Sequence, residues 1–230
     1  MATCEAAPNN ALIKYWGKRD EKLFLPTNGS LSACMDEQLT TRTTVVFSPE
    51  LTSDEGWLDG KRLWRDDLKS AIKIFDLLRA KAKKQWFAHF ASKNDFPTAA
   101  GFASSASGMA ALTIAGTSAL GLKLSIQELS IIARQGSGSA CRSVLGGFVE
   151  WQKGEKSDGS DSFAVQVASP SHWPEFRCVI AIVAEDKKKI SSRSGMKQSI
   201  ATSSLFTQRV RDVPERLEGA KKALLSKNLP

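Results

Sequence analysis

Residues 97–108 read Pro97-Thr-Ala-Ala-Gly101-Phe-Ala-Ser104-Ser105-Ala-Ser-Gly108, a loop of small, uncharged residues around which the rest of the chain is organised. It leads directly into an apolar segment, 109–119, which predicts a buried helix. Small side chains let the backbone approach a ligand, and a helix N-terminus offers unpaired N–H groups and a positive dipole end. Successive amides together with the Ser104 and Ser105 hydroxyls would suit a polyphosphate. Taken alone, the loop is equally compatible with simple tight packing.

A second loop of small residues, 136–143, reads Gly136-Ser-Gly-Ser-Ala-Cys-Arg142-Ser. It follows a predicted helix over 128–134, whose start shows a capping-box pattern because Ser125 precedes Glu128 by three residues. The arginine within the loop can bind a phosphate or a carboxylate through two parallel hydrogen bonds. Two such loops in one chain favour anion binding over packing alone.

The first 48 residues are typical of strands and turns. Strands are predicted over 11–16 and over the β-branched run 40–47. Three basic residues cluster around Tyr15 and Trp16, namely Lys14, Lys18 and Arg19. Two interpretations of this cluster stay open. It is either the solvated basic end of a strand or a phosphate clamp, in which lysine supplies a compact charge and tyrosine a hydrogen-bond donor.

Further elements follow from periodicity and turn residues. The Asp59-Gly60 pair predicts a hairpin turn, and apolar residues at three- and four-residue steps predict an amphipathic helix over 66–84. Residues 177–184, Arg-Cys-Val-Ile-Ala-Ile-Val-Ala, predict the most clearly buried strand of the chain. Helices are expected from 196 to about 210 and, as a new helix permitted by Pro214, up to 225.

Composition sets the broad class. The chain has 230 residues, 42% of them hydrophobic and 24% charged, which is ordinary for a globular protein with a core. Its net charge of +8 suits either a groove for nucleic acid or a pocket for a small polyanion. Because the chain has one tyrosine and no stripe of alternating basic and aromatic residues, we expect no nucleic-acid partner.

Cysteine and histidine usage excludes several kinds of site. The four cysteines are far apart and form no CxxC pair, which argues against a zinc site or a disulfide framework and suits a reducing compartment. The two histidines, His89 and His172, argue against a histidine-centred triad. Since no signal-like segment and no apolar run of membrane-spanning length occurs, we expect a cytoplasmic protein without a membrane partner.

Several motifs together resemble the diphosphomevalonate decarboxylase family of the GHMP kinase superfamily. The Pro-x-x-x-Gly-Phe-Ala-Ser-Ser-Ala loop is typical of the superfamily, and the other blocks are typical of the decarboxylase branch. In chain order the matching blocks are Ala7-Pro-Asn-Asn10, Ile13-Lys-Tyr-Trp-Gly-Lys-Arg-Asp20, Leu25-Pro-Thr-Asn28, 94–106, 136–143 and 158–162. Their order and spacing cover nearly the whole chain.

The resemblance implies an α+β fold. Residues 1–184 would form an ATP- and substrate-binding domain like domain 2 of ribosomal protein S5, and residues 185–230 would begin an incomplete ferredoxin-like second domain. The implied enzyme is an ATP- and Mg²⁺-dependent lyase that converts mevalonate 5-diphosphate into isopentenyl diphosphate, a precursor of isoprenoids and sterols. The family also implies a cytoplasmic homodimer.

Site residues are implied by the same resemblance. Lys14, Ser105 and Arg142 would be catalytic, and Ser105 would also contact Mg²⁺. The substrate-binding residues would be Tyr15, Trp16, Gly17, Lys18, Ser137, Gly138, Ser139, Ala140, Cys141, Arg142 and Ser192. The nucleotide-binding residues would be Ala100, Gly101, Ala103, Ser104, Ser105 and Ala106.

Two departures from the family pattern leave alternatives open. Arg193 stands where the family usually carries threonine, and the chain has no late Asp-Ala-Gly-Pro-Asn-like segment, whose aspartate is thought to act on the substrate hydroxyl. The chain therefore looks C-terminally truncated, and an open sheet edge with an uncovered apolar face is expected there. It could be part of a longer product, a catalytically silent binding or regulatory form, or a half completed by a partner. A related mevalonate 3-kinase or phosphomevalonate decarboxylase is the alternative enzyme.

Overall fold

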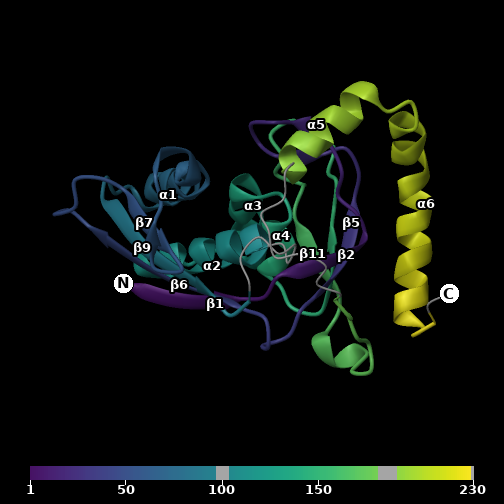
Figure 1. Ribbon diagram of the computed structural model, residues 1–230, viewed down its shortest axis with the longest axis horizontal. Coiled ribbons are helices and arrows are strands. Elements are labelled where there is room, and N and C mark those ends of the chain that lie inside the picture. Colours follow the sequence, from purple (N-terminus) through teal and green to yellow (C-terminus); the bar gives the residue numbers. More distant parts are fainter. Residues whose placement is uncertain (97–103, 181–190, 229–230) are drawn as a thin grey trace.

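The computed structural model describes residues 1–96, 104–180 and 191–228, which form an α+β fold with two main sheets (Figure 1). The elements in chain order are β1 (Ala2–Ala6), β2 (Asn9–Ile13), β3 (Lys18–Asp20), β4 (Leu25–Pro26), β5 (Ser30–Cys34), β6 (Thr41–Ser48), β7 (Glu55–Leu58), β8 (Lys61–Arg62), η1 (Arg65–Asp67), α1 (Lys69–Ala82), β9 (Phe87–Asn94), α2 (Ser104–Ala119), α3 (Ile126–Gly136), α4 (Ala140–Ser143), β10 (Phe148–Trp151), β11 (Ala164–Ala168), η2 (Pro170–His172), α5 (Ser192–Thr202) and α6 (Phe206–Leu225). No helix in the described ranges is long and apolar enough to cross a bilayer.

The first sheet has five strands in the order β1-β6-β9-β7-β8. Its register follows the alternation of β6, in which Thr43, Val45 and Phe47 are buried while the intervening residues face outward. Helices α1 and α2 cover the buried face, where Phe47 and Phe90 of the sheet pack against Phe75 of α1. This core supports α2, whose first turn carries the Ser104–Ser105 pair.

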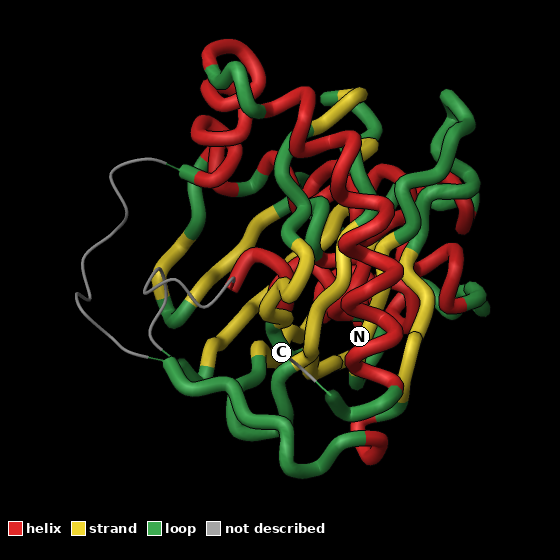
Figure 2. Tube along the Cα trace, turned by 90° about the vertical axis from the view of Figure 1, so that its right-hand side faces the viewer, coloured by secondary structure: helices red, strands yellow, loops and turns green. Residues whose placement is uncertain are grey.

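The second sheet has four strands in the order β11-β10-β5-β2, and it is covered on both faces. Leu31 of β5 and Phe148 of β10 pack against Leu217 and Leu224 of α6 on one face. In Figure 2 the long helix α6 lies in front of the strands of this sheet. On the other face Trp151 packs with residues around α4. The sheet thereby holds the second small-residue loop on its inner side.

Several local predictions are confirmed. The strand predicted over 40–47 is β6, and the Asp59-Gly60 turn joins β7 to β8 with both residues at positive φ, 50° and 77°. The helix predicted over 66–84 is η1 followed by α1. Ser125 and Glu128 form the predicted capping box at the start of α3, where these hydrogen bonds lower the pKa of Glu128 to about 2.

Four helix and strand boundaries were predicted wrongly. The helix predicted from 196 to about 210 is interrupted, because α5 ends at Thr202 and α6 begins at Phe206. Helix α2 begins at Ser104 rather than at 109, because the buried Ser107 hydroxyl bonds to the Ser104 carbonyl within the helix and to the Thr41 hydroxyl of β6. Pro214 lies inside the continuous helix α6, which burial of Val213 and Leu217 holds on both sides of it. Strand β2 ends at residue 13 rather than at 16.

The prediction of a buried strand over 177–184 is wrong for residues 177–180, the part of this range that the structure describes. Residues 177–180 have no strand conformation, and the Val179 side chain is 93% exposed. A buried strand requires neighbouring strands that take up its N–H and C=O groups, and no described strand pairs with these residues. The apolar pattern alone therefore does not determine burial here.

Gly147, between α4 and β10, gives a stability test of the second sheet. Its φ is +77°, and a Cβ atom there would lie 2.4 Å from the Ala168 carbonyl oxygen. We expect Gly147→Ala to lower the free energy of unfolding by about 2 kcal/mol or more, because strain and backbone overlap add. The exposed helical Gly219 has nothing within 4 Å of such a Cβ, so Gly219→Ala should raise stability by about 0.5–1 kcal/mol. Urea denaturation of both variants measures the difference, and similar effects of both would contradict the expectation.

Candidate active site

The guanidinium of Arg142, in α4, is the buried centre of the candidate site. The residue is 2% exposed. Its Nε and Nη2 donate to Asn9 Oδ1 at 3.1 and 2.9 Å, and its Nη1 donates to Ser30 Oγ. Burial lowers the pKa of Arg142, and no carboxylate of the described residues pairs with it. A cation that has only neutral partners in a buried position is suited to receive an anion.

Asn9 connects this arginine to the second small-residue loop. Its Nδ2 donates to the Ser139 carbonyl at 3.0 Å and to Ser143 Oγ at 2.8 Å, while its Oδ1 accepts from Arg142. One amide side chain therefore orients both the guanidinium and the loop backbone. Asn9 was not among the predicted site residues, although a buried asparagine in a strand is a signal that a polar group has a specific partner.

Tyr15 lies beside the same site. Its ring packs against Trp151 with the ring centroids 4.7 Å apart and the planes tilted by 55°. It lies so close to Gly138 that a Cβ there would be 2.9 Å from Tyr15 Cε1. Tyr15 Oη is buried and has no hydrogen-bond partner among the described residues. Burial raises the pKa of Tyr15, so the hydroxyl remains a neutral donor at physiological pH. Trp151 also lies 6.0 Å from the Arg142 guanidinium, which places both polar groups around one indole ring.

The structure brings the two small-residue loops together. Ser105 Oγ, in the first turn of α2, lies 3.4 Å from Ser137 Oγ. Ser104 begins α2, and Ala106 is buried. The predicted nucleotide-binding residues Ala100, Gly101 and Ala103 lie outside the described residues. The meeting of Ser105 and Ser137 joins the predicted nucleotide side of the site to the predicted substrate side.

Three cationic side chains surround the ring of Phe24 close to this site. Lys18 Nζ lies 4.1 Å from the ring centroid, Lys73 Nζ 4.9 Å and the Arg193 guanidinium 5.3 Å. Burial, followed by repulsion from Arg134, lowers the pKa of Lys73. The acidic side chain closest to these cations is Glu21, whose Oε2 lies 2.6 Å from Lys18 Nζ. Such a concentration of positive charge favours binding of a polyanion. Of these three cations, only Lys18 was predicted from the sequence to bind phosphate.

The basic residues near Tyr15 separate into two groups. The Lys18 side chain is 4% exposed and pairs with Glu21, and its role as a phosphate clamp stays a prediction. Arg19 instead donates to the carbonyls of Gly154 and Lys156 and supports a loop. Arg193, at the position that departs from the family pattern, donates to the Gly136 carbonyl at 3.0 Å and so reaches the second loop.

The remaining predicted residues have simpler surroundings. Ser192 is exposed in the first turn of α5, which Ser191 caps, and Trp16 donates to Ser199 Oγ at 3.0 Å. Ala140 and Cys141 are fully buried. Burial raises the pKa of Cys141 to about 12, so its thiol is a packing group rather than a nucleophile.

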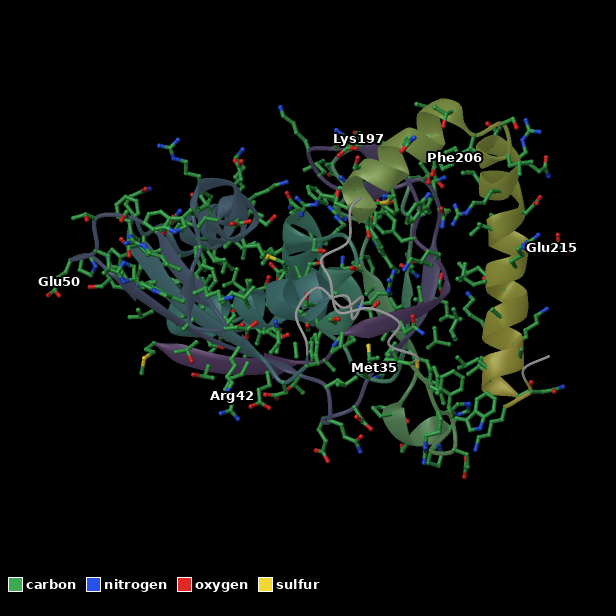
Figure 3. The ribbon with its side chains drawn as sticks, viewed as in Figure 1. Met35, Arg42, Glu50, Lys197, Phe206 and Glu215 are labelled. Carbon is green, nitrogen blue, oxygen red and sulfur yellow. The ribbon has the colours of Figure 1, made fainter. Side chains whose placement is uncertain are left out.

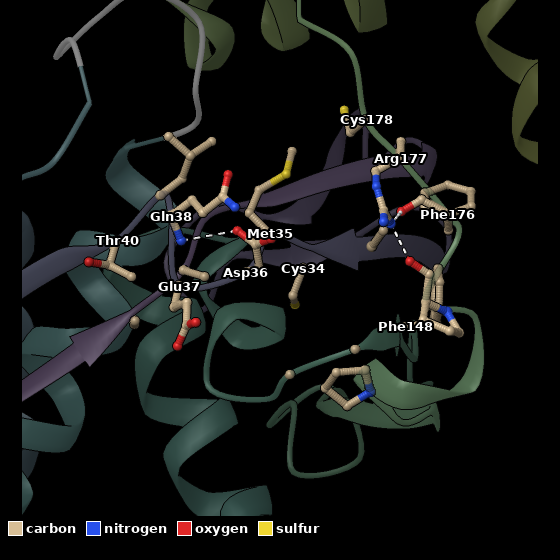
Figure 4. A pocket seen from close by; sticks show the side chains of 18 of the residues that line it. Cys34, Met35, Asp36, Glu37, Gln38, Thr40, Phe148, Phe176, Arg177 and Cys178 are labelled. Carbon is tan, nitrogen blue, oxygen red and sulfur yellow. Dashed lines mark hydrogen bonds between the residues drawn. The ribbon is translucent and has the colours of Figure 1, made fainter.

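A hollow away from the candidate site is a second place to consider. This cavity of about 790 Å³ is bordered by the end of β5 and by residues 170–180 (Figure 4). Its lining includes Asp36 and Glu37 on one side and Arg177 on the other, and it contains none of the predicted site residues. Acidic groups repel polyphosphates, so this cavity does not suit the chemistry indicated by Arg142.

Profiles of known families match most of the chain. Residues 6–164 match the diphosphomevalonate decarboxylase-like N-terminal domain, and residues 178–230 match the mevalonate 5-diphosphate decarboxylase C-terminal domain. Diphosphomevalonate decarboxylases of Candida albicans, Saccharomyces cerevisiae and Homo sapiens are 45%, 42% and 43% identical over 99–100% of this chain. The chain spans 60–67% of the length of these three relatives.

Solved structures agree with the sequence relatives. Mevalonate diphosphate decarboxylase from Staphylococcus aureus superposes with a TM-score of 0.89 at 39% identity, over 99% of this chain and 68% of that one. A complex of MDDEF with MVAPP, AMPPCP and magnesium superposes with a TM-score of 0.87 at 40% identity, over 98% of this chain and 68% of that one. The chain belongs to the diphosphomevalonate decarboxylase family.

Proposed function

We propose that this chain carries the substrate-binding part of an ATP-dependent decarboxylase that converts mevalonate 5-diphosphate into isopentenyl diphosphate. The observation that supports this most directly is the buried Arg142, held by neutral oxygens beside the unpartnered Tyr15 hydroxyl. A substrate with a carboxylate at one end and a diphosphate at the other would match this arginine and the cations around Phe24. The names and complexes of the relatives support the same substrate.

Each group has a role in this proposal. Arg142 binds and orients the carboxylate that leaves as carbon dioxide. Tyr15, Lys18, Ser137 and Ser139 hold the diphosphate. Trp16, Gly17, Gly138, Ala140 and Cys141 shape the surrounding backbone, and Lys14 and Ser192 border it. ATP, when bound, supplies the phosphoryl group that makes the C3 hydroxyl a leaving group, so that the electrons of the broken C–C bond form the alkene.

The donor chemistry at the start of α2 fits a nucleotide and Mg²⁺. The first turn of α2 has no acidic residue, and Ser104 and Ser105 supply hydroxyls at the positive end of the helix dipole. No group of three or more His, Cys, Asp or Glu that could hold a metal occurs among the described residues. Mg²⁺ would therefore be held through nucleotide phosphates with the Ser105 hydroxyl nearby, since this ion commonly binds through phosphates and water.

The cellular setting belongs to the same proposal. We infer a cytoplasmic homodimer in isoprenoid and sterol precursor synthesis, with a small-molecule rather than a nucleic-acid partner. The four cysteines are all free thiols, which is compatible with a reducing compartment. We also propose a domain division near residue 184, within the segment that links β11 to α5.

The first test is release of carbon dioxide from carboxyl-labelled mevalonate 5-diphosphate by the 230-residue chain with ATP and Mg²⁺. We expect the chain to bind mevalonate 5-diphosphate in calorimetry, because the groups around Arg142 and Phe24 are assembled. Carbon dioxide release by the chain alone would show that the family's late aspartate is dispensable. Binding without release would identify a binding-competent chain that lacks part of the catalytic apparatus. Absence of both would overturn the proposed function.

The second test compares substitutions inside and outside the site. Arg142→Lys keeps the charge but loses the two-pronged geometry, and we expect it to weaken mevalonate 5-diphosphate binding at least about tenfold. Ser105→Ala should weaken Mg²⁺·ATP binding in the presence of the substrate, because it removes one donor at the start of α2. Arg42→Ala is the control, since Arg42 pairs with Glu5 on the outer face of the first sheet (Figure 3). Equal losses in calorimetry for all three variants would contradict the site.

A further inference from the structure

The segment Lys14–Gly17 leaves the second sheet just before the candidate diphosphate site. Strand β2 ends at Ile13, so the carbonyl groups that follow are no longer paired by β5. Backbone carbonyls removed from both sheet and solvent need other hydrogen-bond donors. Tyr15 and Lys18, the proposed diphosphate ligands, lie within or next to this segment. Whatever satisfies these carbonyls therefore also sets where the two ligands point.

Arg209, in the first turn of α6, supplies donors to two of these carbonyls, while the Gly17 carbonyl accepts from the Thr27 N–H at 3.1 Å. Its Nη2 donates to the Lys14 carbonyl at 2.6 Å, and its Nη1 donates to the Trp16 carbonyl at 3.3 Å and to Asn28 Oδ1 at 2.9 Å. Asn28 Nδ2 in turn donates to the Lys14 carbonyl at 3.2 Å. A planar guanidinium can bridge several fixed acceptors in this way, whereas a lysine ammonium acts as a point charge.

Two more contacts from the same region reach this segment. Trp16 Nε1 donates to Ser199 Oγ of α5. Gly17 has a φ of +115°, and a Cβ there would lie 2.7 Å from the Phe206 ring, so only glycine fits beneath this side chain. Figure 3 labels Phe206 at the corner where α5 passes into α6. The α5–α6 corner thus holds the segment at successive residues, with Arg209 making most of the hydrogen bonds.

The partners of Arg209 are neutral oxygens rather than carboxylates. Partial burial lowers its pKa, and no acidic side chain contributes to that shift. Asp212, one turn further along α6, accepts a hydrogen bond from Gln208 instead. An arginine placed only to form a surface ion pair would show the opposite pattern, with a carboxylate as its first partner. Its contacts here are directed to the backbone of the substrate segment.

We propose that Arg209 is a positioning residue for the diphosphate end of the substrate. Its guanidinium fixes the backbone of Lys14–Gly17 and thereby holds Tyr15 and Lys18 in their binding positions, without touching the substrate. The role rests on the proposed function, because it concerns the same site. It also makes α6 part of the binding apparatus, although α6 lies about 195 residues along the chain from Lys14.

The test measures the dissociation constants of mevalonate 5-diphosphate and of inorganic pyrophosphate by calorimetry. Pyrophosphate probes the diphosphate end alone, whereas the full substrate also engages Arg142. We expect Arg209→Gln to weaken both ligands by the same factor, about five- to tenfold, and Arg209→Lys to restore less than half of the loss on a logarithmic scale. The melting temperature is measured in parallel, so that binding is compared at a temperature at which every variant is folded.

Arg216→Gln is the matched control. Arg216 lies two turns further along α6 and lines a pocket to which Lys14 and Arg209 also contribute. In the described part of the chain it makes no hydrogen bond to Lys14–Gly17. The substitution Arg216→Gln removes the same charge as Arg209→Gln. It should leave both dissociation constants within about twofold of those of the unmodified chain.

Equal weakening by both substitutions would show a general electrostatic effect and overturn the positioning role. A greater loss for the full substrate than for pyrophosphate, or unchanged binding in Arg209→Gln, would overturn it too. Failure of the unmodified chain to bind mevalonate 5-diphosphate would instead overturn the proposed function beneath it.

Discussion

The burial of one charged group, the Arg142 guanidinium, constrains much of this structure. Removing an ion from water is costly unless hydrogen bonds replace its hydration, and here Asn9 and Ser30 supply oxygen acceptors. Asn9 belongs to β2, Ser30 to β5 and Arg142 to α4, so a single hydrogen-bonded group ties two strands of one sheet to the second small-residue loop. None of these acceptors carries a charge, so they do not neutralise the arginine.

The same organisation explains why the C-terminal helices matter to a site that is formed mainly by the first part of the chain. Helix α6 buries Leu217 and Leu224 against the outer face of the second sheet, which fixes the position of its first turn. From there Arg209 reaches the carbonyls of Lys14 and Trp16. Packing of α6 on the sheet is thereby coupled to the backbone of Lys14–Gly17. The exposed Val179 shows the converse, since none of the described strands pairs with residues 177–180.

Predictions from sequence succeeded where short-range chemistry decides the structure. The capping box at Ser125, the Asp59-Gly60 turn and the alternating strand β6 depend on residues within a few positions of one another. They failed where packing overrides local preference. Pro214 does not end α6, because the buried residues on both sides of it hold the helix together. Similarly, the hydrogen bond between Ser107 and Thr41 of β6 holds the start of α2 in a stretch whose small residues predict a loop.

The sequence by itself determined the family, the order of most elements and the identity of the two loops whose serines meet at Ser105 and Ser137. Only the tertiary structure decided how neighbouring basic residues divide their roles, with Lys18 facing Phe24 and Arg19 supporting a distant loop. It also revealed Asn9 and Arg209, whose partners lie 133 and up to 195 residues away in the chain. The physical reason is that such contacts depend on sheet register and on how helices pack, and neither leaves a periodic signal near the residues involved.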